Sequence, residues 1–148
     1  MFILLVDNNR FYVSVLKEML VRAGFDRIEY ADNGLECFLQ ICKGDIPDVV
    51  IIDENQLYEN GVDVLKNIRT SCPELTVIIL TDTISLQTAV QNSERGSTYY
   101  ITKESITTDN LPHVLYNIFT EKFNTVKHSS VHRTISSFRR TISSMLSF

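Results

Sequence analysis

The stretch from Asp48 to Asn55 places four consecutive β-branched apolar residues directly before an acid, Asp53. A strand that is apolar on both faces belongs in the middle of a parallel sheet covered by helices on both sides. Open α/β sheets bind ligands at the carboxyl ends of such strands. Asp53 is therefore a candidate site residue, although a lone acid can also simply mark where a strand leaves the core.

Strands and helices alternate along most of the chain. Apolar runs predict buried strands at residues 2–6, 49–52, 76–80 and 99–102, and alternation predicts a strand near residues 28–30 that is buried on one face, near a sheet edge. Helical spacing predicts helices over Phe11–Leu20, Leu35–Cys42, Gly61–Ile68, Ser85–Arg95 and Leu111–Phe119. Asn8 or Asn9 can cap the first helix, and Gly61 opens the third. The pattern predicts an α/β fold, a doubly wound five-stranded parallel sheet with helices on both faces.

Charge and composition indicate one domain followed by a tail of different character. The net charge is −4, and all eighteen Asp and Glu residues lie within residues 1–123. Residues 124–148 hold four Lys and Arg residues and no acid. We predict a folded domain over residues 1–123 and a basic, serine-rich amphipathic tail or linker helix over residues 124–148.

The predicted tail repeats a seven-residue unit, since Arg133–Phe138 recurs as Arg140–Met145 with one change. Its apolar residues lie four and three apart, as in a coiled-coil seam. Three alternatives stay open: a flexible tail, a helix that reaches a partner or a second copy in a homodimer, and a basic segment on an anionic surface. Four basic residues without a recognition motif argue against nucleic acid as a partner of this chain.

Cysteine usage and apolar runs bear on the compartment. Cys37, Cys42 and Cys72 lack the spacing of a metal site and are expected to be buried free thiols of a reducing cytosol. The run Phe2–Val6 is too short for a signal peptide or a membrane span. We therefore expect a cytoplasmic protein without a membrane partner.

Four of the predicted strands end in a polar side chain: Asp7, Asp53, Thr81 and Lys103. These ends converge on one edge of the sheet in the predicted fold. The two carboxylates would repel each other, so Mg²⁺, which prefers oxygen ligands, is their natural partner. With the Thr81 hydroxyl, the Lys103 cation and a carboxylate nucleophile at Asp53, the set has the parts that stabilise a transferring phosphoryl group. Helix caps at Asp7 and Thr81 and a solvated Lys103 are the structural alternatives.

The motifs of residues 2 to about 123 resemble those of a known family, the receiver domain of two-component response regulators (the CheY-like domain). The matching pieces are Leu4-Leu5-Val6-Asp7-Asn8, Val50-Ile51-Ile52-Asp53, Gly61, Ile79-Leu80-Thr81 and Gly96-Ser97-Thr98-Tyr99-Tyr100-Ile101-Thr102-Lys103. The spacings of 46, 28 and 22 residues between the four strand-end residues also fit the family. The resemblance implies a flavodoxin-like (βα)5 sheet with strand order 2-1-3-4-5.

The resemblance also implies the chemistry of the site. Asp53 would accept a phosphoryl group from a histidine kinase or a phosphotransfer protein, and Thr81 and Lys103 would contact its oxygens. Asp7, Asp53 and the backbone carbonyl of Asn55 would hold Mg²⁺, with the side-chain amide oxygen of Asn8 coordinating it directly or through water. The chain would not be an enzyme beyond self-phosphorylation from small donors and autodephosphorylation.

Thr81 and Tyr100 would form the switch that the resemblance implies. Phosphorylation would change which protein partner docks on the face of the fourth helix, the fifth strand and the fifth helix. The chain would be a stand-alone receiver or the receiver half of a longer regulator whose output domain is absent.

Three residues depart from the family pattern. Asn8 stands where the family usually has a second carboxylate, so we predict weaker Mg²⁺ binding than is usual. Leu57 and Glu104 replace two prolines of the loops after Asp53 and Lys103, which predicts more mobile loops or a different turn.

There are three alternatives to a phosphoacceptor, and the departures above favour the first of them. A non-phosphorylated pseudo-receiver that acts as a protein-interaction module stays open. A haloacid-dehalogenase-like phosphatase would need a second acid two residues after Asp7, where Asn9 stands. A flavodoxin-like electron carrier would need a phosphate loop after the first strand, and Asp-Asn-Asn-Arg is not one.

Overall fold

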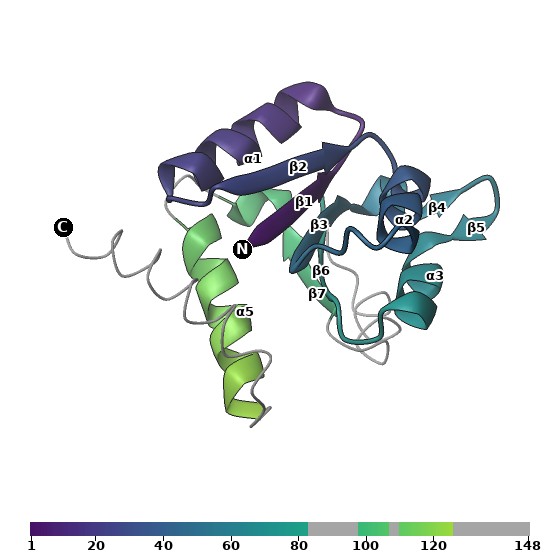
Figure 1. The fold of residues 1–148 in the computed structure, drawn as a ribbon. Coiled ribbons are helices and arrows are strands. Elements are labelled where there is room, and N and C mark those ends of the chain that lie inside the picture. The colour runs from purple at the N-terminus through teal and green to yellow at the C-terminus, as the bar shows by residue number, and fades with distance from the viewer. Residues whose placement is uncertain (83–97, 107–109, 126–148) are drawn as a thin grey trace.

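Five parallel strands form the main sheet of the computed structural model, which describes residues 1–82, 98–106 and 110–125. The strands are β1 (Phe2–Val6), β2 (Arg27–Ala31), β3 (Val49–Asp53), β6 (Thr76–Thr81) and β7 (Thr98–Thr102). They lie in the order β2-β1-β3-β6-β7, and every neighbouring pair is parallel (Figure 1). Numbered along the chain within this sheet, the order is 2-1-3-4-5, so the predicted topology is confirmed.

The central strand β3 is buried along its whole length. Alternate residues of a strand point to opposite faces of the sheet, and both faces of β3 are covered. Val49 and Ile51 belong to one apolar cluster, with Leu16 and Leu115. Val50 and Ile52 belong to a second cluster on the other face. The double burial that four β-branched residues in a row predict is therefore present.

The described helices divide between these two faces. They are α1 (Arg10–Arg22), α2 (Gly34–Cys42), α3 (Val64–Ser71) and α5 (Leu111–Thr125). The buried residues of α1 and α5 belong to the first cluster, and those of α2 and α3 belong to the second (Figure 1). The doubly wound arrangement is confirmed for these helices. The helix predicted over Ser85–Arg95 lies outside the described residues.

The third helix begins later than predicted. Gly61 does not open it; Asn60 and Gly61 instead form the turn of a small hairpin, β4 (Tyr58–Glu59) and β5 (Val62–Asp63). Both turn residues have positive φ, 51° and 78°, which is the conformation that an Asn-Gly pair favours between two short strands. The helix then begins at Val64, and the Asp63 carboxylate caps it by accepting a hydrogen bond from the Lys66 backbone N–H at 3.0 Å.

Burial on α1 and α2 differs in part from the predicted apolar stripes. Phe11 and Leu39 have helical spacing but are 80% and 50% exposed, whereas Val13 is buried. Cys37 is a buried thiol whose pKa burial raises to about 12. Cys42 is exposed and Cys72 is half-buried, so the expectation of three buried thiols is wrong for both.

The strand β2 lies at one edge of the sheet, as its alternating pattern predicts. Ile28 packs against the first cluster, and Tyr30 is half exposed. The guanidinium of Arg27 lies 2.8 Å from a carboxylate oxygen of Asp45 and 3.7 Å from one of Glu29. This edge therefore carries charged pairs rather than an apolar strip.

The last helix passes the predicted domain boundary. It begins at Leu111, with Pro112 in its first turn as predicted, and continues to Thr125. The boundary itself stays a prediction, because residues 126–148 lie outside the described part of the chain. In the ranges that the structure describes, no helix has the length and apolar character needed to cross a membrane.

Candidate functional site

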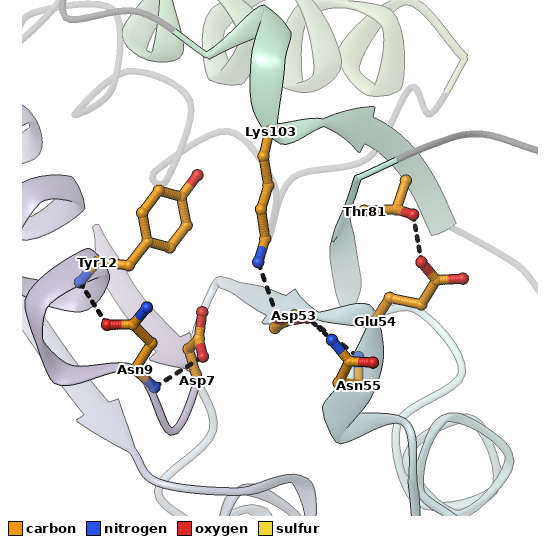
Figure 2. Close-up of polar contacts among 8 residues, drawn as sticks. All are labelled: Asp7, Asn9, Tyr12, Asp53, Glu54, Asn55, Thr81 and Lys103. Atoms are coloured by element: carbon orange, nitrogen blue, oxygen red, sulfur yellow. Dashed lines mark hydrogen bonds and ion pairs between the residues drawn. The ribbon is translucent and has the colours of Figure 1, made fainter.

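Asp53 ends the central strand with its side chain buried. One carboxylate oxygen, Oδ1, accepts hydrogen bonds from the backbone N–H of Asn55 at 3.0 Å and from the Asn55 side-chain amide at 3.2 Å. The other, Oδ2, lies 3.0 Å from the Lys103 ammonium (Figure 2). The carboxylate is thus held in one orientation by partners from two different elements.

Asp7 directly follows β1, the strand that pairs with the strand of Asp53, β3. Val6 pairs with Ile52 in the parallel register, so the next residue of each strand is one of these two acids. Asp7 is also buried, and its Oδ1 accepts a hydrogen bond from the Asn9 backbone N–H at 2.9 Å. Burial and the charge of Asp53 raise the pKa of Asp7 above its ordinary value, against the opposing effects of that hydrogen bond and of Lys103.

Lys103 reaches Asp53 from the end of β7, where it opens the short 3-10 helix η2 (Lys103–Ser105) (Figure 2). Burial alone lowers its pKa, but the hydrogen bond to Asp53 and the charges of Asp53, Asp7 and Asp82 outweigh burial, so the pKa of Lys103 is raised. The ammonium also lies 5.1 Å from the centre of the Tyr12 ring. At that distance the ring face attracts the cation.

Thr81 ends β6, one residue beyond the partner of Asp53 in the sheet register. It is 2% exposed, and its hydroxyl donates a hydrogen bond to a carboxylate oxygen of Glu54 (Figure 2). Glu54 begins the 3-10 helix η1 (Glu54–Gln56) that follows β3. Sequence reasoning missed this contact: the Asp53-Glu54 pair is visible in the sequence, but no pattern there joins Glu54 to Thr81.

The other predicted site residues lie at the rim or behind the site. Asn8 is exposed in the bend after Asp7, and Asn9 rather than Asn8 caps α1, accepting a hydrogen bond from the Tyr12 backbone N–H at 3.1 Å. Asn55 is bonded to Asp53. Tyr100 is half-buried on β7 and packs against the second cluster.

Glycine is required at a contact behind the site. A Cβ atom on Gly34 would lie 2.1 Å from the Gln56 carbonyl oxygen and 2.9 Å from a methyl carbon of Val64. Gly34 is the first residue of α2, so its missing side chain lets this helix pack directly on the loop that follows Asp53. The sequence contains this glycine after an Asp-Asn pair, where it reads only as a turn signal.

The donor set fits a hard divalent cation such as Mg²⁺. Asp7 and Asp53 offer buried carboxylate oxygens, and the raised pKa of Asp7 reflects in part the repulsion between them. Mg²⁺ keeps several waters and needs only one or two protein carboxylates. In the part of the chain that the structure describes, no three His, Cys, Asp or Glu side chains form a group that could hold a metal ion. The site therefore fits a cation held mostly by two acids.

Comparison with known sequences identifies the family to which the fold belongs. A family model described as the response regulator receiver domain matches residues 3–115. Chemotaxis protein CheY-3 of Vibrio cholerae is 32% identical over 103 residues, covering 68% of this chain and 78% of that protein. Transcriptional regulatory protein ZraR of Klebsiella oxytoca is 32% identical over 101 residues, covering 68% of this chain and 22% of ZraR. The match thus spans about a fifth of the ZraR chain.

Solved structures share the fold. The receiver domain of the Francisella response regulator 1452 has a TM-score of 0.67 and 24% identity, with 81% of this chain and 97% of that chain covered. A response regulator receiver domain protein from Clostridium thermocellum has a TM-score of 0.67 and 26% identity, with 84% and 98% covered.

Proposed function

The chain belongs to the response regulator receiver domain family, and on that premise we propose that it is a phosphoacceptor switch of a two-component pathway. Asp53 is the residue that takes the phosphoryl group. The donor is the phosphohistidine of a histidine kinase or of a phosphotransfer protein. The cytoplasm, where such donors lie, is the compartment that goes with this function.

The ion pair of Asp53 and Lys103 is the observation that carries the proposal. In the transfer, one Asp53 oxygen attacks phosphorus, the bond from phosphorus to the donor's imidazole nitrogen breaks, and its electron pair leaves with the imidazole. The product is an acyl phosphate. The Lys103 ammonium, 3.0 Å from Oδ2 of Asp53, is already in place to offset the negative charge that the transfer brings to this carboxylate.

We assign Mg²⁺ binding to Asp7, Asp53 and the backbone carbonyl of Asn55, with Asn8 at the rim. The bound ion would neutralise charge between the two acids and the incoming phosphoryl oxygens. Asn8 brings no charge where the family usually has an acid, so we propose weaker binding than is usual.

We further assign the switch to Thr81 and Tyr100. The phosphoryl group adds charge and three acceptor oxygens next to the Thr81 hydroxyl, and a bond between them would draw Thr81 toward Asp53. Tyr100 on β7 pairs with Ile79 on β6, and Ile79 lies two residues before Thr81 on that strand. A movement of Thr81 would therefore reach the surface of β7 and α5, where a downstream protein partner would dock.

Intact-mass measurement tests the phosphoacceptor function. The full chain is incubated with acetyl phosphate and Mg²⁺, beside the Asp53→Asn variant. A phosphoryl adduct on the wild type that is absent from Asp53→Asn supports the proposal. The absence of an adduct with this donor and with a partner phosphohistidine would reject it.

A pseudo-receiver that never takes phosphate is the second candidate. Two observations favour it: Asn8 removes a carboxylate from the metal site, and the Thr81 hydroxyl is bonded to Glu54. In that case partner binding by the full chain would be the same for the wild type and Asp53→Asn, with or without the phosphodonor.

A further inference from the structure

Glu54 holds the hydroxyl that the phosphoryl group would need. Thr81 is nearly fully buried, and its hydroxyl donates to a carboxylate oxygen of Glu54. Glu54 is half-buried and directly follows the acceptor Asp53 in the chain. Figure 2 shows its carboxylate turned toward Thr81, on the side of Asp53 away from Asp7. Two neighbouring residues thus have separate partners: Asp53 has Lys103, and Glu54 has Thr81.

The hydroxyl of threonine has one proton to donate. It cannot donate to Glu54 and to a phosphoryl oxygen at the same time. A hydrogen bond to an ionised acceptor is stronger than one to a neutral group, so release of Thr81 from Glu54 has a cost. The phosphoryl group and Glu54 are also both anionic and attached to consecutive residues, so they repel each other.

We propose that Glu54 is a positioning residue that restrains phosphorylation, because it competes with the phosphoryl group for the Thr81 hydroxyl. The inference rests on the proposed function and adds a residue to it. In the unphosphorylated protein, the Glu54–Thr81 bond keeps the switch threonine on the Glu54 side. Phosphoryl transfer must break this bond, so Glu54 lowers the rate and the extent of acyl-phosphate formation.

Two substitutions separate hydrogen bonding from charge. Glu54→Gln removes the charge but keeps an oxygen that can accept from Thr81, and Glu54→Ala removes both. If competition for the hydroxyl matters, the rate of phosphoryl-adduct formation rises more in Glu54→Ala than in Glu54→Gln. If charge alone matters, the two variants gain equally. Glu104→Gln is the matched control, since it removes one acid beside Lys103 from an exposed position.

The experiment follows the phosphoryl adduct of the full chain over time by intact mass, with acetyl phosphate and Mg²⁺. An Asp53 oxygen attacks phosphorus, and acetate leaves with the electron pair of the broken P–O bond. We expect formation to be about tenfold faster in Glu54→Ala than in the wild type, the equivalent of one hydrogen bond to a charged group. Glu54→Gln should lie between them, and Glu104→Gln should stay within about twofold of the wild type.

A Thr81→Val background tests whether the effect acts through the hydroxyl. There, Glu54→Ala and Glu54→Gln should form adduct at rates equal within about twofold, because neither has a hydroxyl to release. A second readout needs no phosphate: urea unfolding of the wild type, Glu54→Ala, Thr81→Val and the double variant should show coupling between the two positions. If the loss of stability in the double variant equals the sum of the losses in the two single variants, the Glu54–Thr81 bond does not hold Thr81.

Each outcome has one meaning. No adduct on the wild type or on any variant rejects the proposed function and this inference with it. Adduct on all proteins at equal rates, or slower formation in Glu54→Ala, overturns the role of Glu54 and leaves Asp53 as the acceptor. Equal gains in Glu54→Ala and Glu54→Gln also overturn it, because charge alone would then explain the effect.

Discussion

At the scale of single residues, two buried acids and the Lys103 cation lie together in the described part of the site. Asp7 and Asp53 are both buried, and Lys103 makes its ion pair with Asp53. The Asp7 carboxylate is poorly solvated because it is buried. Its charge is stabilised by the hydrogen bond that its Oδ1 accepts from the Asn9 backbone N–H. Burial, together with the charge of Asp53, raises the pKa of Asp7, so its ionised form is costly in the folded protein.

Replacing Asp7 tests this electrostatic cost. Because the pKa of Asp7 is raised above 3.8, the folded state binds its proton more tightly than the unfolded state. Its contribution to stability is therefore present below that ordinary value and is lost as pH rises through the folded pKa. In chelator, Asp7→Asn should raise the free energy of unfolding at neutral pH by about 1 kcal/mol, a typical single-residue effect.

Urea unfolding of the wild type and Asp7→Asn from about pH 3 to about pH 8 measures the difference between their free energies of unfolding. The advantage of Asp7→Asn should shrink as the solution becomes more acidic. A constant advantage at all pH values would mean that packing, and not the charge of Asp7, is responsible.

Replacing Asn8 tests the metal site. Asn8→Asp adds a carboxylate next to Asp7, and a further charged oxygen ligand strengthens the binding of a hard cation. We expect Mg²⁺ affinity to rise about tenfold, measured by calorimetric titration. Asn9→Asp is the matched control, because Asn9 caps α1 with its side chain and an acid can keep that cap. Tight, ordinary Mg²⁺ affinity in the wild type would contradict the idea that Asn8 weakens the site.

At the scale of elements, α2 packs closely on the loop that follows β3, and Gly34 makes this contact possible. Gly34→Ala would place a methyl group 2.1 Å from the Gln56 carbonyl oxygen, so the helix or the loop has to move. Overpacking of this kind costs about 1–3 kcal/mol, and we expect a loss of that size in urea unfolding. Gly44→Ala is the comparator: its Cβ meets no atom within 4 Å, so it carries only the cost of a left-handed backbone, about 1 kcal/mol. Equal losses would argue against the overlap at Gly34.

The elements were predictable to different degrees. The buried strands and their order follow from continuous apolar runs and from the family resemblance, because burial on both faces leaves little freedom in such strands. The strand-end residues Asp7, Asp53 and Lys103 meet as predicted, since parallel strands carry their ends to one edge. Thr81 lies at the same edge but is bonded to Glu54.

The misses have local causes. Gly61 alone suggests a helix start, whereas the Asn60-Gly61 pair forms a hairpin turn. Helical spacing also places Phe11 on the predicted apolar stripe, but the buried residues of α1 are Val13, Leu16 and Leu20, and Phe11 in the first turn is exposed. The contact of Glu54 with Thr81 depends on how η1 turns after β3, and periodicity carries no information about that turn.

At the scale of the whole molecule, the predicted tail can be tested as a separate segment. Because α5 continues to Thr125, a truncation after that residue keeps the last described helix whole. If residues 126–148 drive self-association, the full chain should be larger in solution than residues 1–125, as measured by light scattering over a range of concentrations. Equal sizes would reject a dimerising role for the tail.

The charged edge of the sheet has a consequence for how these molecules behave when crowded together. An outer strand leaves backbone groups unpaired, and a flat, apolar one is a template on which other chains can add as fibrils. Here β2 carries Arg27 and Glu29, and Arg27 is also tied to Asp45. A second chain that approached this border would have to break these pairs. The charged pairs at this edge therefore oppose the addition of a strand from another chain.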